Sequence, residues 1–493
     1  MKLSKKLEEN LKVFKERLGI GETFDTLSRE FKVAGKNAAL IYIDGFIKDV
    51  ITSRLLASLM KVERQEIVPN VIQKLLDGTL DYFEIDKADT VEEVISQVLA
   101  GPLALLIDGE ETAIILDVRE YPGRQPQEPD IERVSRGSRD GFVETVVFNT
   151  TLIRRRLRDP NLRFEMIKVG KRSQSDVAVC YIKDIADENL INTIKNRLEN
   201  IEVDGIPMAE KSVEEFIVDK KLWWNPFPTV RYTERPDVAA VHLLEGHVLV
   251  MVDTSPSVMI LPVTLFHHLE HAEEYREDMA VGVYFRLVRF LGVLISFFLP
   301  PLWILFALYP EFLPSNLAFI GPQEPGNVPI LLQFILGELG IDMIRMAGVH
   351  TPSPLATSLG LIGAVLLGDF AVRVGLFAPE TILYTALAAI GTFMTPSLEF
   401  AYAVRIWRII LVIITGIFGI WGLVGGLLIS FIIIATTKSF NVPYLWPLIP
   451  LNLRALYTVL IRQPAPVKTR RPEFLNPRDP DSAPDFRKKR RGR

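Results

Sequence analysis

The residues with the clearest potential for chemistry are three charged side chains inside an apolar stretch, LLQFILGELGIDMIRMAGV, at Leu331–Val349. Glu338, Asp342 and Arg345 are spaced i, i+4 and i+7, so on a helix they fall within about 60° of one another and form one polar stripe. Ionisable side chains in a membrane-type helix mark ion pathways, proton relays or ion pairs that brace helices. The stripe is therefore the first candidate for a functional site.

Two interpretations of this polar stripe remain open. Asp342 and Arg345 can pair at i, i+3, whereas Glu338 has a like charge four residues on, so one carboxylate is left over. That carboxylate either lines a polar cavity or pore, or joins a structural network. Three charges cost roughly 8–10 kcal/mol at mid-bilayer and about a dozen apolar residues return roughly 4–7 kcal/mol, so the stripe needs protein or water beside it. A ring of such stripes would carry one net negative charge per subunit, which favours cations.

A second candidate is the stretch LGLIGAVLLGDFAVRVGLF, in which small residues recur every four positions. Small side chains at this spacing let two helices approach closely. In a ring of identical subunits the same face would border a narrow pathway with an apolar constriction. Close packing without conduction is the alternative. The candidate pore-lining or packing residues are Gly360, Ala364, Val365, Leu366, Gly368 and Asp369.

A basic cluster lies in the polar half of the chain, at Arg154, Arg155, Arg156 and Arg158. Such a cluster can bind phospholipid head groups or nucleic acid. A solvated face, or one that forms salt bridges between subunits, is the simpler interpretation. We keep the cluster as a possible interaction patch and expect no nucleic-acid partner.

The segment HHLEH places His267 and His271 at i, i+4, a spacing that can hold zinc, with His268 between them. No third ligand follows at a recognised distance, and Glu270 is not placed as in the H-E-x-x-H motif. We therefore expect no metal site here, but an amphipathic helix near a membrane surface. No Walker-type loop, nucleophile elbow or redox pair of cysteines occurs, so we expect neither an enzyme nor a cofactor.

The 493 residues divide into unlike parts, although 56 basic and 60 acidic side chains nearly balance. Residues 1 to about 285 mix charged and apolar side chains, residues from about 287 to 437 are mostly apolar, and the tail 461–493 is basic and expected to be disordered and cytosolic. The single cysteine, Cys180, excludes an internal disulfide framework. The amphipathic opening segment 1–35 contains no signal-peptide core, so we expect the N-terminal part to lie in the cytoplasm.

A helical membrane domain is predicted over residues 285–460, with spans near 287–309, 354–377, 378–396 and 405–437. The last run, whose uncharged part follows Arg405 and Arg408, exceeds the bilayer core, so we expect tilt or a kink near its glycines between 416 and 426. A cytoplasmic N-terminal part and a basic tail on the same side require an even number of crossings. The polar helix 329–349 is then a re-entrant or interfacial element, or a true span if 378–396 is not one.

Two α/β subdomains are predicted before the membrane domain, at residues 36–125 and 131–280. In the first, NAALIYIDG reads as a strand, VITSRLLASLMKV as a helix, and PLALLIDGEETAIILDV as two strands joined at Asp108-Gly109. The segment YPGRQPQEPD separates the subdomains, and their similar rhythm indicates a duplicated module. The fold class is thus α/β plus an all-α membrane domain: two tandem cytosolic α/β subdomains followed by a polytopic helical membrane domain.

Several blocks of this sequence resemble the A subunits of spore germinant receptors, the GerA family. The resemblance runs from about Asn37 to Pro450, although Asp342, Met346 and the HTPSP that begins at His350 depart from the usual family pattern. The segment EPDIERVSRGSRDGF favours an accessory branch of the family over the receptors proper. The resembling blocks are SRGSRDGFVETVVFNTTLIRRRLRDPNLRFEMIKVGKRSQSDVAVCYI, VDTSPSVMILPVTLF, AGVHTPSPLATSLGLIGAVLLGDFAVRVGLFAPE and NVPYLWPLIPLN.

The resemblance implies a multi-pass protein of the spore inner membrane that assembles as an oligomeric ion channel and opens during germination. We expect a cation channel, or a subunit of one, that transmits or amplifies the germination signal. A non-conducting scaffold or sensor, or a germinant receptor A subunit proper, is the alternative. The implied partners are further copies of the chain, a small membrane subunit, other germination proteins and membrane lipid.

Overall fold

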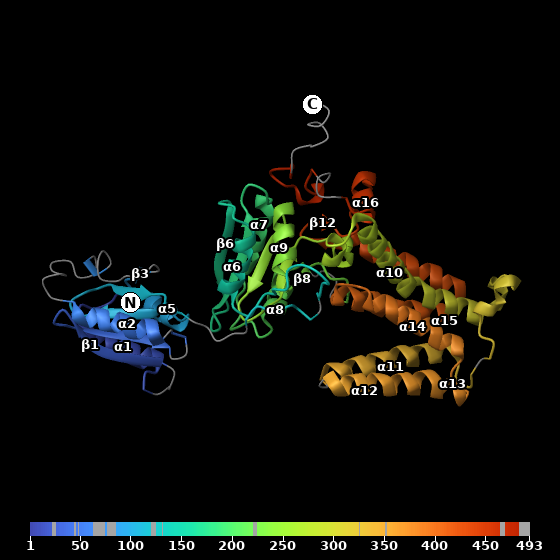
Figure 1. Ribbon diagram of the computed structural model, residues 1–493, viewed down its shortest axis with the longest axis horizontal. Helices are drawn as coiled ribbons and strands as arrows, with labels where there is room; N and C mark the ends of the chain where they lie inside the picture. Colours follow the sequence, from blue (N-terminus) through green and yellow to red (C-terminus); the bar gives the residue numbers. More distant parts are fainter. Residues whose placement is uncertain are drawn as a thin grey trace, which may run out of the picture. The chain divides into compact units, whose positions relative to one another are not determined.

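The computed structural model describes residues 1–21, 26–43, 46–47, 49–62, 74–75, 85–119, 125–130, 132–219, 224–324, 326–350, 353–463 and 469–482. The chain divides into two compact units, residues 1–124 and 125–493 (Figure 1). The first unit is an α/β subdomain. The second unit combines another α/β subdomain with a bundle of apolar helices.

A five-stranded antiparallel sheet forms the first unit, in the order β1-β2-β4-β5-β3. Its strands are β1 (Thr26–Val33), β2 (Lys36–Ile43), β3 (Ile85–Ala88), β4 (Leu103–Ile107) and β5 (Ala113–Leu116). Helices α1 (Leu7–Leu18) and α5 (Val91–Leu99) pack on one face of the sheet, and α2 (Asp49–Lys61) packs on the other. Because both faces are covered, β2 and β4 are apolar on both sides, as the sequence of each strand shows.

The amphipathic opening segment belongs to this subdomain. Helix α1 buries Leu7, Leu11, Phe14 and Leu18, which lie at helical spacing, against the sheet. The backbone N–H of Leu7 donates to the carboxylate of Asp108 at 3.0 Å, which ties the start of α1 to the β4–β5 turn. The sequence predicts an opening segment separate from the first α/β subdomain. In the structure its helix α1 instead forms part of the layer that covers one face of the sheet.

The second sheet repeats the strand order of the first: β6-β7-β9-β10-β8. Its strands are β6 (Leu162–Val169), β7 (Ser175–Ile182), β8 (Arg231–Thr233), β9 (Val248–Val252) and β10 (Val258–Leu261). Helices α6 (Val146–Arg156) and α9 (Pro236–Glu245) cover one face, and α7 (Glu188–Glu199) and α8 (Ala209–Ile217) cover the other. In both sheets the third strand of the chain is added last, beyond the fifth, which agrees with the interpretation of a duplicated module.

The connection from the second sheet to the helical bundle consists of two 3₁₀ turns, η2 (Leu265–Leu269) and η3 (Ala272–Tyr275). The prediction of an amphipathic helix over HHLEH is therefore wrong. His267 lies in η2, and His271 caps η3 by accepting the backbone N–H of Glu273 at 3.2 Å, so the two rings do not share one helical face.

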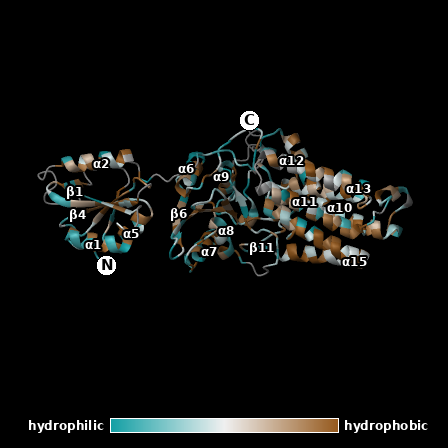
Figure 2. Cartoon of the chain, turned by 90° about the horizontal axis from the view of Figure 1, so that it is seen from below, coloured by the Kyte–Doolittle hydropathy of each residue, from teal (hydrophilic) through white to brown (hydrophobic). Residues whose placement is uncertain are grey.

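The helical bundle contains α10 (Met279–Leu308), α11 (Ile330–His350), α12 (Ser353–Ala364), the π-helical turn η6 (Val365–Phe370), α13 (Ala371–Arg373), α14 (Pro379–Phe393) and α15 (Leu398–Thr436). Short turns η4 (Pro310–Phe312) and η5 (Ser315–Ile320) follow α10, and β11 (Lys438–Ser439), β12 (Val442–Pro443), α16 (Leu453–Leu460) and η7 (Glu473–Leu475) follow α15. Apolar residues dominate α10 and α15 (Figure 2). Of the described helices, these two are long and apolar enough to cross a membrane.

Helix α15 folds back on itself at Gly419, whose φ of +59° and ψ of −137° are not helical. Leu411 lies against Gly426, and the carbonyl of Ile414 lies against Gly422. In a straight helix Leu411 and Gly426 would stand about 22 Å apart, so α15 is a hairpin of two arms. The expectation of a kink among these glycines is confirmed, and the long apolar run makes two passes along the bundle.

The helical segments run alternately between the end next to the second sheet and the far end. Tyr309, after α10, meets the Gly419 turn at the far end. Gly391 of α14 meets Gly292 of α10, and at the near end Thr437 accepts a hydrogen bond from Asn225 at 2.9 Å. Among the described residues this gives six passes: α10, α11, α12 to α13, α14 and the two arms of α15.

The predicted spans correspond only in part to these passes. The runs 287–309 and 405–437 lie in α10 and α15, whereas the run 354–377 is broken by η6, and the run 378–396 contains the 15-residue helix α14. A 15-residue helix is about 22 Å long, which is less than a bilayer core. The polar helix 329–349 corresponds to α11, one continuous helix of 21 residues.

Arg235 holds the segment before α6 against the second sheet. Its fully buried guanidinium pairs with Asp237 at 2.9 Å and donates to the carbonyls of Glu132, at 3.0 Å, and Ser138, at 2.9 Å. Burial alone would raise the pKa of Asp237, but Arg235 and Arg276 outweigh it and lower that pKa. The hydrogen bonds of this one guanidinium thus hold a segment that belongs to no helix or strand.

We predict that Arg235→Met destabilises the second α/β subdomain by about 3 kcal/mol or more, because it leaves buried acceptors without donors. The control is Arg172→Met, which removes an exposed pair with Asp204 and is expected to cost at most about 1 kcal/mol. Urea unfolding of the full chain in detergent, followed by tryptophan fluorescence, compares the two. Equal midpoints for both variants would contradict the assigned role of Arg235.

Candidate functional site

The polar stripe of α11 lies in the middle of the helical bundle, facing α15. Glu338 is 1% exposed, and the two side chains opposite it, Arg405 and Arg408, are 3% and 0% exposed. The i, i+3 spacing of the arginines on α15 places both guanidiniums on the face that meets α11. A buried carboxylate and two buried guanidiniums therefore form the centre of the site.

Glu338 is paired mainly through Oε2, which accepts a hydrogen bond from Nη2 of Arg408 at 2.9 Å and lies 2.9 Å from Nη2 of Arg405. Oε1 lies 2.9 Å from the same Arg408 nitrogen but accepts no hydrogen bond among the described residues. Arg405 also donates to the backbone carbonyl of Glu338 at 2.6 Å. A buried carboxylate is tolerated when it is paired and hydrogen-bonded in this way.

Arg408 joins four helices. Its Nη1 donates to the carbonyl of Ser296 on α10 at 3.1 Å and to Oγ1 of Thr392 on α14 at 3.1 Å. With Glu338 on α11, these contacts connect α10, α11, α14 and α15 at one level of the bundle. The small residues Gly292 and Gly391 allow α10 and α14 to approach closely one turn away.

The other two residues of the stripe lie at the open edge of the network. Asp342 is paired with Arg405 at 2.5 Å and with Arg345 at 3.3 Å, and its side chain is 34% exposed. The guanidinium of Arg345 lies over the rings of Tyr402 and Phe393, 5.1 and 5.4 Å from their centroids. The network thus passes from a dry centre at Glu338 to a partly accessible end at Asp342.

With Arg405 and Arg408 included, the five charged residues carry two negative and three positive charges, a formal net charge of +1. The stripe alone would have carried −1, so its charge no longer gives a reason for cation preference. Within this chain Glu338 is buried and paired with Arg405 and Arg408, so it braces the bundle. The sequence held a signal for this: Arg405 and Arg408 were taken as the flank of a span, yet their spacing complements that of Glu338 and Asp342.

The second candidate, on α12 and η6, is largely uncovered. Apart from the neighbouring residues and the backbone of the same helix, no described atom lies within 4 Å of where a Cβ would stand at Gly360 or Gly368. Ala364 and Val365 are exposed as well, while the side chain of Leu366 lies outside the described part of the chain. The small residue that packs on α11 is instead Gly363, against Ile344.

Asp369, at the end of this face, is not a free carboxylate. It accepts a hydrogen bond from Nε of Arg373 at 2.8 Å, and both side chains are exposed. The pair lies on the surface of the bundle, one turn apart, and can reach solvent or another subunit.

The basic cluster divides into two structural and two open arginines. Arg156 pairs with Asp140 at 2.6 Å, and Arg154 donates to the carbonyls of Asp159, at 2.7 Å, and Leu162, at 3.0 Å. Arg155 and Arg158 are exposed and line a shallow hollow with Thr151 and Pro160. An interaction patch, if it is used, thus depends mainly on Arg155 and Arg158.

The chain belongs to the family described as Bacillus/Clostridium GerA spore germination protein, whose model matches residues 12–474. This confirms the family resemblance and assigns the chain to spore germination proteins, and the names of its relatives denote germination or sporulation proteins rather than enzymes.

Among its relatives, stage V sporulation protein AF of Bacillus subtilis (strain 168) is 48% identical over 471 residues, which cover 96% of this chain and 95% of that protein. Spore germination protein GerLA of Bacillus cereus is 31% identical, over 98% of this chain and 99% of that one. The solved N-terminal domain of the A subunit of the Bacillus megaterium spore germinant receptor GerK3 is 30% identical, with a TM-score of 0.22, over 53% of this chain and 96% of that one.

We predict that Glu338→Gln destabilises the helical bundle by about 3–5 kcal/mol, because the buried guanidinium of Arg408 loses its carboxylate partner and that of Arg405 keeps only Asp342. The control is Asp369→Asn, the same chemical change in an exposed i, i+4 pair, which is expected to cost about 0.5 kcal/mol or less. Thermal unfolding in detergent measures both variants. If Glu338→Gln and Arg408→Gln are additive in the double variant, the two side chains are not coupled and the assigned network is wrong.

Proposed function

We propose that this chain is a multi-pass protein of the spore inner membrane that assembles with copies of itself into an ion-conducting complex, and that this complex transmits or amplifies the germination signal. The observation that carries the proposal is the uncovered small-residue face of α12. Family membership supports the germination role, and the two apolar helices α10 and α15 support the membrane location.

The alternation of the helices supports a multi-pass arrangement. Six passes bring the end of α15 back to the end where α10 began, so the α/β subdomains and the segment after α15 lie on one side of the membrane. An even number is what the positive-inside rule requires for a basic tail on the side of the N-terminal domain.

The bare face of α12 supports assembly. Gly360 and Gly368 leave open space beside large apolar side chains such as Leu361, which is 68% exposed. Small residues on an exposed membrane helix favour close helix–helix contact between subunits. The π-helical turn η6 interrupts the same helix, and such turns occur often at functional positions.

Conduction between subunits is the proposed role of this face. In a ring of subunits, α12 from each copy would border a central path, with Val365 as a candidate constriction. The Glu338 network would hold α11 rigidly behind α12. The Glu338 network contains both positive and negative side chains, so it does not indicate whether cations or anions would cross. Ion-selectivity measurements decide this.

A non-conducting scaffold or sensor is the second candidate. It is favoured by the exposed Arg155 and Arg158 and by the two α/β subdomains, which offer docking surfaces for other germination proteins or a small membrane subunit. Both candidates require assembly, and they differ in whether ions cross.

We predict that Gly360→Leu and Gly368→Leu leave the stability of the isolated chain unchanged but reduce its assembly, because leucine fills space that a neighbouring subunit must occupy. The control is Gly425→Leu on α15, where a Cβ also meets open space. Chemical cross-linking in detergent and single-channel recording in planar bilayers read out assembly and conduction. Assembly without conductance would support the scaffold, and full assembly of both α12 variants would refute the role of this face.

A further inference from the structure

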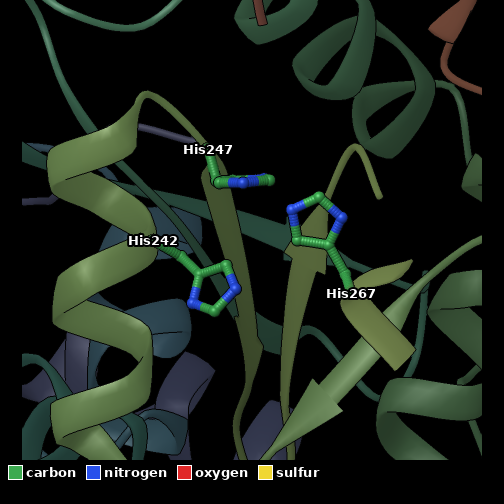
Figure 3. Close-up of side chains that lie close together, drawn as sticks. All are labelled: His242, His247 and His267. Carbon is green, nitrogen blue, oxygen red and sulfur yellow. The ribbon is translucent and has the colours of Figure 1, made fainter. Parts of the chain in front are cut away.

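Three buried histidines converge in the second α/β subdomain. His242 lies on α9, His247 directly precedes β9, and His267 lies in η2 (Figure 3). One potential ligand atom of each residue lies within 4.8 Å of those of the other two. The side chains are 5%, 0% and 8% exposed. Of the six histidines in the chain, three thus meet at one point although they are up to 25 residues apart.

Hydrogen bonding fixes which nitrogen of His242 can bind a metal ion. Nδ1 of His242 lies 2.8 Å from the carbonyl of Val238 and donates its proton there, so Nε2 carries the lone pair. That Nε2 is buried and has no hydrogen-bond partner in the described part of the chain. A ring nitrogen fixed as an acceptor by a carbonyl on its other side is the usual state of a metal-bound histidine.

His267 contacts Thr264. Its Nδ1 accepts a hydrogen bond from the backbone N–H of Thr264 at 3.1 Å and lies 2.8 Å from Oγ1 of the same residue. Ligation through Nε2 requires the proton on Nδ1, which then donates to Oγ1 and gives up the hydrogen bond from the backbone N–H. The ring therefore keeps a hydrogen bond in the tautomer that binds metal.

The three rings are buried, and the neutral imidazole is the form that binds a metal ion. The charge of Glu245 acts in favour of a cation at these rings, and the charge of Arg231 acts against it. Phe474 covers His247 and His267, with ring centroids at 6.0 and 5.5 Å.

We propose that His242, His247 and His267 form a site for one Zn²⁺ ion. Imidazole nitrogen suits zinc, and three protein ligands with an open fourth position form a common zinc geometry. Zn–N bonds of about 2.0–2.1 Å place tetrahedral ligands about 3.4 Å apart, so the rings need to close by little more than 1 Å. A cavity of about 180 Å³ lies beside His267, and its lining includes Glu245 and Glu270 as well as Arg286.

The site would act on the junction between the α/β subdomain and the helical bundle. Its ligands come from the last helix over the sheet, the next strand and the turn that leads into α10. A metal ion would therefore fix η2 to the sheet, while Phe474, in η7 near the end of the chain, closes the site. The role of the metal ion would be structural or regulatory. The proposed zinc site does not depend on whether the protein conducts ions.

The test uses the full chain in detergent, stripped with a chelator and then titrated with Zn²⁺ alone. We expect about one zinc per chain by elemental analysis, and a rise in the unfolding midpoint that saturates at one equivalent. Co²⁺ in place of Zn²⁺ should give the intense visible absorption of a tetrahedral site without thiolate bands. Binding of less than about 0.2 zinc ions per chain at micromolar zinc, or an octahedral cobalt spectrum, would overturn the proposal. Both measurements use the unmodified chain and do not depend on the folding of any variant.

The variants assign the ligands. His242→Gln, His247→Gln and His267→Gln should each weaken zinc binding at least about tenfold, the usual effect of losing one ligand or its orienting partner. His271→Gln is the matched control, since His271 lies in the same connection but outside the cluster, and it should bind zinc as the unmodified chain does. Unchanged binding in His247→Gln, whose ring lies between the other two, would show that zinc is held elsewhere.

Discussion

The ion pair between Glu338 and Arg408 is the interaction on which the helical bundle depends. A carboxylate and a guanidinium at 1% and 0% exposure are tolerable only as partners, and each also needs further hydrogen bonds. Arg408 meets that need with groups on α10 and α14, and Glu338 meets it with Arg405. The positions of four helices are thus fixed relative to one another at a single level. A second polar contact joins α11 to α14 where Gln333 accepts hydrogen bonds from Ala378 and Thr381.

This constraint explains why the bundle can leave one face uncovered. Helices held only by apolar contact in a membrane can slide, because lipid competes equally well for their surfaces. A charged network does not slide, since each displaced group would be left unpaired. Helix α11 is therefore anchored from behind, and α12 can present glycines to the outside without losing its place.

The fold was largely predictable because it rests on local patterns. Period-2 alternation and the Asp108-Gly109 turn identify strands, and long apolar runs identify α10 and α15. The two arms of α15 were not predictable from hydropathy, because a reversal at a single glycine leaves the apolar run unbroken. The opening helix α1 was separated from its sheet for the opposite reason: its apolar face indicates burial but not the surface against which it packs.

The candidate site was predictable in its parts and not in its partners. Glu338, Asp342 and Arg345 stand out because charge is rare in such a helix. Their partners Arg405 and Arg408 are 67 and 70 positions beyond Glu338, and no spacing rule connects residues on different helices. The histidines show the same limit: HHLEH drew attention to His267 and His271, but the neighbours of His267 come from α9 and β9.

The reversal at Gly419 has a mechanical consequence. The arm that begins after Ser397 starts beside His268, and the arm that ends at Thr437 finishes beside Asn225, so both are rooted in the same α/β subdomain. A rocking motion of the hairpin tip would push one root while it pulls the other. Such a motion would rotate the second α/β subdomain rather than translate it. The hairpin would thereby couple movement in the helical bundle to movement of that subdomain.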